Sequence, residues 1–154
     1  MLIKLAEGVS FGTSPSVISQ AGIPIDYRDH AHSFERADFQ GARLQGSTLR
    51  GTRLAGANFT RANADRADFS SCDLRGATLT QCSVRDGLLI RADLTDAVMT
   101  AAGLLGAVMQ AATVQGANLR DAVLFGAHLT RWRGDPASVE GAVMSRTSLR
   151  KGVS

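Results

Sequence analysis

A five-residue repeat runs from His32 to Leu129 in twenty consecutive units, without a single insertion. We number each unit by its central residue, i. Nineteen of the twenty central residues are large and apolar, and Ala64 is the exception. Two residues earlier, at i−2, alanine fills fourteen units. The other six units carry at this position His32, Ser47, Thr52, Cys72, Cys82 and Gly87. Each unit therefore offers one large residue and one i−2 residue to an interior.

The period of five excludes both common regular structures. An α-helix turns by about 100° per residue, so a five-residue period would spread the apolar residues around the whole helix. A flat strand alternates its faces every second residue, so an odd period would send successive central residues to opposite faces. The side chains share one side only if the backbone turns a corner in each unit. Glycine occupies position i+2 in eight units, and it tolerates the positive φ angles of tight corners. The repeat therefore predicts an all-β solenoid with a filled axis.

Several units resemble the repeats of the pentapeptide-repeat proteins, whose pattern is A(D/N)LxX. The clearest are Arg36-Ala37-Asp38-Phe39-Gln40, Gly56-Ala57-Asn58-Phe59-Thr60, Arg91-Ala92-Asp93-Leu94-Thr95 and Gly116-Ala117-Asn118-Leu119-Arg120. The resemblance implies a right-handed quadrilateral β-helix with four units per coil. About five to six coils are then expected, and five coils about 4.8 Å apart make a rod of about 24 Å.

Three segments are expected. Residues 1–31 lack the repeat and predict an N-terminal capping arm over the first coil, with partner binding or a secretion signal as the alternative. Residues 32–130 form the repeat domain. In residues 131–154, Trp132 takes a small inward position, so we expect a loop there and Trp132 as a lid on the core. Either a degenerate final coil or a terminal helix follows, and the resumed five-residue phase favours the coil.

The four walls of such a rod differ in their outward residues. In the lower coils, nearer the N-terminus, these outward residues are polar. In the upper coils, nearer the C-terminus, two neighbouring walls carry apolar residues at i−1 and i+1, with Val98 on an adjoining wall. The predicted interface residues are Leu88, Ile90, Leu105, Val108, Val123 and Phe125. A contiguous exposed apolar patch usually marks an interface. The occupant is either a second molecule, with a homodimer as the simplest version, or one of the chain's own arms.

The net charge of +3 is concentrated at the C-terminal end. Residues 131–154 carry five bases against two acids, whereas residues 32–130 carry ten arginines against nine acids. The candidate anion-binding residues are Arg131, Arg133, Arg146, Arg150 and Lys151. Apart from Trp132 they lack an aromatic stacking platform, so direct binding to nucleic acid or a membrane is disfavoured against a solvated basic tail.

The sequence lacks the motifs of an enzyme. His30, His32 and His128 have no partner at the spacing of a metal site or a nucleophile and its base, so we expect no catalytic residue, metal or cofactor. Cys72 and Cys82 are half a coil apart, on opposite sides of the rod, which predicts two buried free thiols. Such thiols, together with the absence of a long apolar run or a signal-like N-terminus, predict a cytoplasmic protein.

The predicted function is a non-catalytic scaffold that binds an unidentified protein partner through the apolar edge. The family resemblance implies an alternative, a resistance or immunity protein that binds DNA gyrase or another type II topoisomerase. Some such family members act as acidic mimics of DNA. Mimicry needs a strongly negative surface, and the many outward arginines of this chain depart from that pattern.

Overall fold

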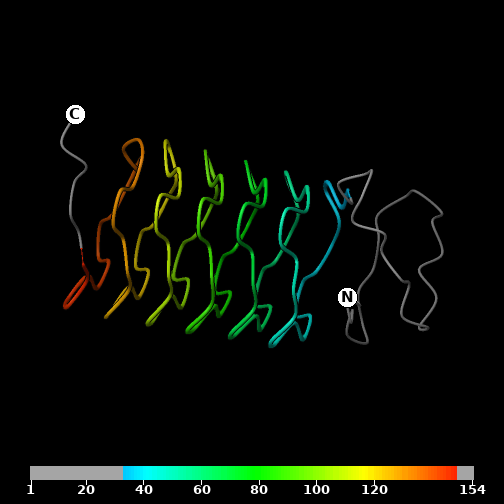
Figure 1. Cartoon of the computed structure of the whole chain (residues 1–154), viewed down its shortest axis with the longest axis horizontal. Coiled ribbons are helices and arrows are strands. Elements are labelled where there is room, and N and C mark those ends of the chain that lie inside the picture. Colours follow the sequence, from blue (N-terminus) through cyan, green and yellow to red (C-terminus); the bar gives the residue numbers. More distant parts are fainter. Residues whose placement is uncertain (1–32, 149–154) are drawn as a thin grey trace.

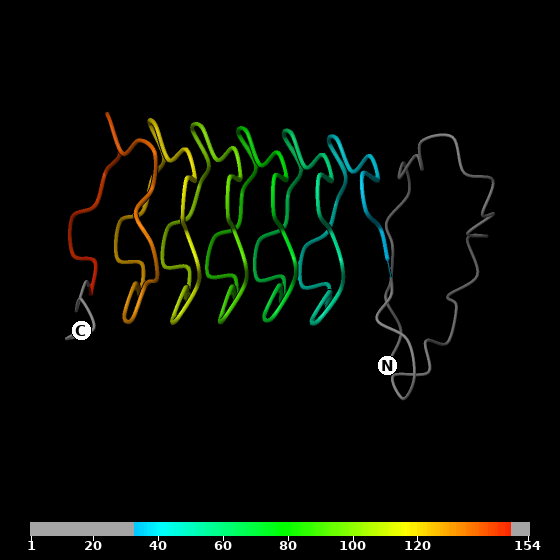
Figure 2. The same cartoon turned by 90° about the horizontal axis from the view of Figure 1, so that it is seen from above.

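The computed structural model describes residues 33–148, and this part of the chain is a β-helix solenoid (Figure 1). Its backbone pairs are isolated parallel bridges of one residue each, and no helix or longer strand is formed between residues 33 and 148. Each bridge joins residues twenty apart, from Ser33 with Arg53 to Val123 with Val143. The two perpendicular views show successive coils stacked side by side along one axis (Figures 1 and 2). The predicted capping arm of residues 1–31 lies outside the described residues, as do Arg150 and Lys151.

A repeating set of backbone hydrogen bonds holds neighbouring coils together. The N–H of Phe39 donates to the carbonyl of Asn58 at 2.7 Å, and the N–H of Asn58 donates back to Ala37 at 2.9 Å. A third bond closes each corner, as where the N–H of Ala42 donates to the carbonyl of Phe39 at 2.9 Å. These bonds pair backbone groups that would otherwise be buried without partners between coils. Because the paired residues on neighbouring coils are about twenty apart, one coil of the solenoid contains twenty residues.

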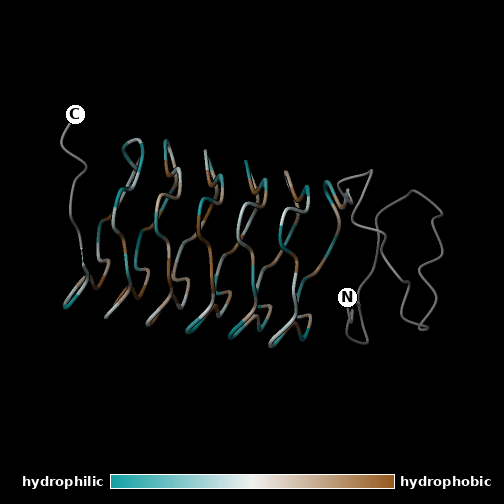
Figure 3. Cartoon of the chain, viewed as in Figure 1, coloured by the Kyte–Doolittle hydropathy of each residue, from teal (hydrophilic) through white to brown (hydrophobic). Residues whose placement is uncertain are grey.

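The central and i−2 side chains fill the axis of the solenoid, as the repeat predicts. Every central residue from Phe39 to Leu129 is at most 1% exposed. The i−2 residues from Ala37 to Ala127 are buried as well, including Ser47 and Thr52. Apolar residues accordingly recur in every coil along the axis (Figure 3). The expected arrangement of one large and one small inward residue per unit is confirmed.

Ala64 is the one small central residue, and aromatic rings compensate for it. Phe59 and Phe69 belong to the units on either side of Ala64, and their rings meet edge to face with centroids 5.6 Å apart. Phe59 also stacks on Phe39 with centroids 4.8 Å apart. Ala64 is fully buried beside them. The two rings can meet across the interior because the residue between them is small. Neighbouring side chains thus fill the interior at this level.

The corners have positive φ in every unit, whatever the residue. The eight glycines at i+2 in the repeat region have φ between 63° and 71°, which confirms the expected role of glycine. Twelve other residues at the same position have φ between 52° and 60°, mostly Arg and Asp but also Ala101 and Ala111. This left-handed conformation is strained for L residues, so these corners are held by the bonds between coils.

Ala101→Gly is expected to raise the free energy of unfolding by about 0.5 kcal/mol. The substitution removes left-handed strain of about 1–2 kcal/mol, and the greater freedom of glycine in the unfolded chain offsets part of the gain. Gly126→Ala is the matched reverse change, because nothing lies within 4 Å of an added Cβ there. It should lower the free energy of unfolding by a similar amount. Urea unfolding of the three chains measures both, and a shift of the same sign in both variants would contradict the account.

The chain departs from the regular path after Trp132 and then returns to it. Trp132 is partly buried and packs against the core, as a lid would, although its Nε1 has no hydrogen-bond partner. Gly134 has a φ of 77°, and the N–H of Ala137 donates to Ala117 at 2.8 Å. The twenty-residue register continues beyond, with Ser138 bridged to Asn118. The segment up to residue 148 follows the path of a further coil, and the alternative terminal helix is not formed within it.

A candidate interaction edge

Two adjoining walls carry the six residues of the predicted interface. We call them the Leu104 wall and the Met109 wall after one central residue of each. Residues Leu105, Val123 and Phe125 lie on the Leu104 wall, and Leu88, Ile90 and Val108 lie on the Met109 wall. We call the six together the apolar edge. A parallel bridge joins Leu88 to Val108, and another joins Val123 to Gly103. The twenty-residue register therefore stacks residues that are far apart in the sequence.

The apolar edge is unevenly exposed. Val123 and Phe125 are each 37% exposed, whereas Leu88, Ile90, Leu105 and Val108 are half-buried. Stacked coils are only about 4.8 Å apart, so each side chain is partly covered by those above and below it. The most accessible part of the edge is therefore its upper end, on the Leu104 wall.

Val143 extends this upper end by one coil, and it was not among the residues predicted from the sequence. It is bridged to Val123, twenty residues earlier, and it is 44% exposed. The signal was present in the register, since a residue twenty positions after an exposed valine falls on the same wall. Val98 is also exposed, at 38%, but it belongs to a different wall and lies between Thr78 and Asn118.

The corner between the two walls has little side-chain bulk at its centre. Four residues, each twenty apart, follow one another along it, and we call them the corner strip: Asp86, Gly106, Gly126 and Arg146. All four have positive φ. A Cβ added at Gly106 would meet the Asp86 carboxylate, and one added at Gly126 would meet nothing within 4 Å. The Asp86 carboxylate therefore lies over Gly106, and the backbone between the acidic and the basic residue is bare only at Gly126.

Arg146 covers part of Phe125. Its guanidinium carbon lies 5.4 Å from the centroid of the Phe125 ring. A cation over an aromatic face is attracted by the ring electrons, by about 0.5–1 kcal/mol at exposed sites. Arg146 is also a predicted anion-binding residue, and its position beside the apolar edge was not anticipated from the sequence.

The remaining described candidates for anion binding, Arg131 and Arg133, are exposed but lie elsewhere. Arg131 is at the next corner, on the other side of the Met109 wall, and Arg133 is bridged to Thr113 on the wall beyond. The structure thus places Arg131 and Arg133 near each other and separates both from Arg146 by the width of a wall.

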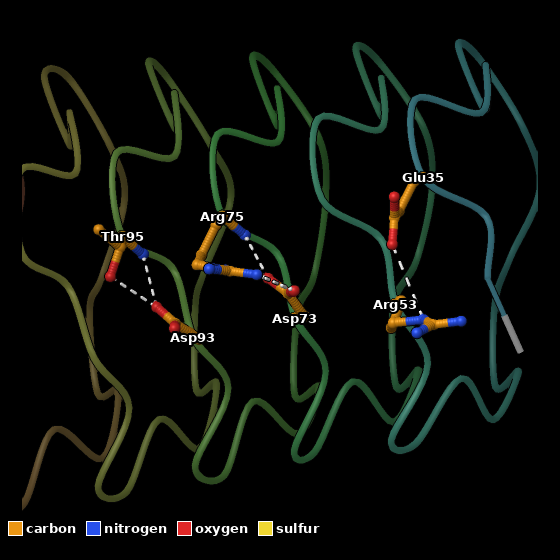
Figure 4. Close-up of polar contacts among 6 residues, drawn as sticks. All are labelled: Glu35, Arg53, Asp73, Arg75, Asp93 and Thr95. Atoms are coloured by element: carbon orange, nitrogen blue, oxygen red, sulfur yellow. Dashed lines mark hydrogen bonds and ion pairs between the residues drawn. The ribbon is translucent and has the colours of Figure 1, made fainter. Parts of the chain in front are cut away.

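A third wall, which contains Asp73 and Asp93, is polar, and two of its acidic residues, Glu35 and Asp73, pair with arginines (Figure 4). Arg75 donates two hydrogen bonds to Asp73, from Nε at 2.8 Å and from Nη2 at 2.7 Å. The same guanidinium lowers the pKa of the Asp73 carboxyl. Glu35 pairs with Arg53 at 3.7 Å. Exposed pairs of this kind add little stability.

The two cysteines are buried and free, as predicted. Desolvation raises the pKa of both thiols to about 12. Such thiols stay protonated at neutral pH, and the thiolate is the reactive form. Among residues 33–148 no group of three or more His, Cys, Asp or Glu side chains is placed to hold a metal ion. In the same part of the chain, no helix has the length and apolar character needed to cross a membrane.

The comparisons with known proteins agree with the repeat. The family model for pentapeptide repeats matches eight copies over residues 37–76. The same unit, with the same burial and the same twenty-residue register, continues to Leu129. Residues 37–76 are therefore pentapeptide repeats, and the units that follow continue them in the same register.

Solved structures of this class are similar to the chain. HetL, a pentapeptide-repeat protein involved in heterocyst differentiation regulation from the cyanobacterium Nostoc sp. strain PCC 7120, is 26% identical over 75% of this chain and 60% of its own, with a TM-score of 0.43. Rfr23 from the cyanobacterium Cyanothece 51142 is 22% identical over 66% of this chain and 63% of its own, with a TM-score of 0.46.

QnrB1, a plasmid-mediated fluoroquinolone resistance protein, is 21% identical over 80% of this chain and 66% of its own, with a TM-score of 0.49. The chain therefore spans less than two thirds of the length of each of these three proteins. Among curated proteins no relative matches the chain.

Proposed function

We propose that the protein is a non-catalytic interaction scaffold and that the apolar edge is its contact surface. The observation that carries this proposal is the exposure of Val123, Phe125 and Val143 together on one wall, in a protein whose other described walls are mainly polar. Exposed apolar patches of this kind mark interfaces. The solenoid is already ordered by its backbone bonds, so little conformational entropy is lost when a partner binds. The two buried free thiols fit a reducing compartment such as the cytoplasm.

The double variant Leu105→Asp/Phe125→Asp tests the contact surface. Both side chains point outward, so the substitutions should leave the coils folded while two charges abolish apolar contact. Wild type and variant are immobilised, and the proteins that each retains from the native organism are compared, together with the mass of each purified chain. We expect the variant to lose partners, or mass, that the wild type keeps. Identical partners and identical mass would overturn the proposal.

Topoisomerase binding is the alternative that the family resemblance implies. The described residues argue against DNA mimicry as the mode of topoisomerase binding, because exposed arginines such as Arg43, Arg66 and Arg85 interrupt any continuous negative surface. A supercoiling assay with purified gyrase decides the alternative. If the protein neither inhibits nor protects the enzyme, the alternative is excluded.

A further inference from the structure

The corner strip has an acidic residue at one end and a basic residue at the other, so it is complementary to a second copy that runs in the opposite direction. Asp86 is at one end, Arg146 is at the other, and Gly106 and Gly126 lie between them. Among residues 33–148 neither Asp86 nor Arg146 takes part in an ion pair. Beside the strip, on the Leu104 wall, Leu105 and Phe125 repeat the symmetry with one apolar residue on each of the two middle coils. A second copy of the chain can therefore satisfy both the charges and the apolar side chains.

Only one of the two possible two-fold arrangements uses this symmetry. If the axis runs along the rod, the copies are parallel, and each residue of the strip faces its own equivalent. Asp86 then faces Asp86 and Arg146 faces Arg146, and such like-charge pairs oppose association. If the axis is perpendicular to the rod, in the interface between the copies and at a level between Gly106 and Gly126, the copies are antiparallel. Asp86 of each copy then faces Arg146 of the other, and Leu105 faces Phe125.

The middle of the strip allows close approach. Gly126 has no heavy atom within 4 Å of where a Cβ would be, whereas the Asp86 carboxylate takes that place over Gly106. In the antiparallel arrangement the open backbone at Gly126 of one copy faces Gly106 and the Asp86 carboxylate of the other, while Leu105 and Phe125 meet beside them. Arg146 is already held near this contact by the Phe125 ring, so less side-chain entropy is lost when it pairs with a carboxylate.

We propose that the corner strip and the adjoining Leu104 wall form a self-association surface on which two copies pack antiparallel about a two-fold axis. This inference rests on the proposed function, that the apolar edge is a contact surface, and it names the partner as a second copy of this chain. It also assigns a function to two charged residues, Asp86 and Arg146, that are not part of the apolar edge.

Charge reversal tests the antiparallel pairing. Asp86→Arg and Arg146→Asp each put like charges together at both ends of the dimer, so each should weaken dimerisation by about tenfold or more. The combined variant Asp86→Arg/Arg146→Asp restores both attractions within one chain and should dimerise like the wild type. A mixture of the two single variants should form heterodimers. Sedimentation at several concentrations measures all four samples. Both residue types already occupy left-handed corners elsewhere in the fold, so the variants are compatible with the backbone.

Asp96→Arg is the matched control. Asp96 also has positive φ, and its carboxylate also lies against a glycine twenty residues later, Gly116. It is at the diagonally opposite corner, so its reversal should leave the dimer unchanged. A wild type that stays monomeric at the highest soluble concentration, or a dimer that ignores both single reversals, overturns this inference. Neither result affects the proposed function, which fails only if Leu105→Asp/Phe125→Asp keeps every partner and the mass of the wild type.

Discussion

Phe59→Ala should lower the free energy of unfolding by about 3–5 kcal/mol, the usual cost of removing a buried aromatic side chain. Phe59 is fully buried, stacks on Phe39 and meets Phe69 edge to face. Its loss removes both ring contacts and leaves a cavity that stacked coils cannot close, because their spacing is fixed by backbone bonds. Urea unfolding followed by circular dichroism measures the change.

Two further variants make this result interpretable. Phe59→Leu keeps an apolar side chain in the same position and should cost clearly less than Phe59→Ala, so it remains measurable if the alanine variant does not fold. Val98→Ala shortens an exposed side chain on the same wall two coils further on and should stay within about 0.5 kcal/mol of the wild type. If Phe59→Ala costs no more than Val98→Ala, the aromatic contacts do not hold the core.

Ala64→Leu should destabilise the protein by about 1–3 kcal/mol, although leucine is the commonest central residue of the repeat. The interior beside Ala64 is occupied by the meeting rings of Phe59 and Phe69, so the longer side chain has no room. The same urea unfolding measures the change. A gain in stability would mean that the space beside Ala64 is open.

The double variant Phe59→Leu/Ala64→Leu tests the reason for this effect. Replacing one ring by a smaller side chain frees volume on the side where the new leucine side chain would enter. The two substitutions should therefore cost less together than the sum of their separate costs, by about 0.5–3 kcal/mol as for other residues in contact. Strict additivity would show that Ala64 and Phe59 do not share the same space.

The backbone was predictable because the repeat leaves so few alternatives. A period of five with one large and one small apolar residue requires a corner in every unit, and each corner has the positive φ that the glycines indicated. Burial of Leu94 or Met99 followed from position alone. These properties depend on the register and not on the detailed shape of any side chain.

The candidate edge was predictable in position but not in exposure. Register placed Leu88 and Val108 together on the surface, yet both are half-buried, since the cover given by neighbouring coils depends on the size of each stacked side chain. The position of Arg146 over Phe125 could not be foreseen for a related reason. It requires that the chain resume its register after the irregular segment at Trp132, and the sequence alone left a helix open as the alternative.

The twenty-residue circuit also turns the corner strip into a measure of length. Asp86 and Arg146 are three circuits apart, so only a copy with the same interval can satisfy both ends of an antiparallel pair. A natural loss or duplication of one whole circuit between them would preserve the interior stacking. The altered chain could then pair with copies of itself but no longer with the original chain. In such a lineage, a change in the number of coils would therefore change which chains can dimerise with one another.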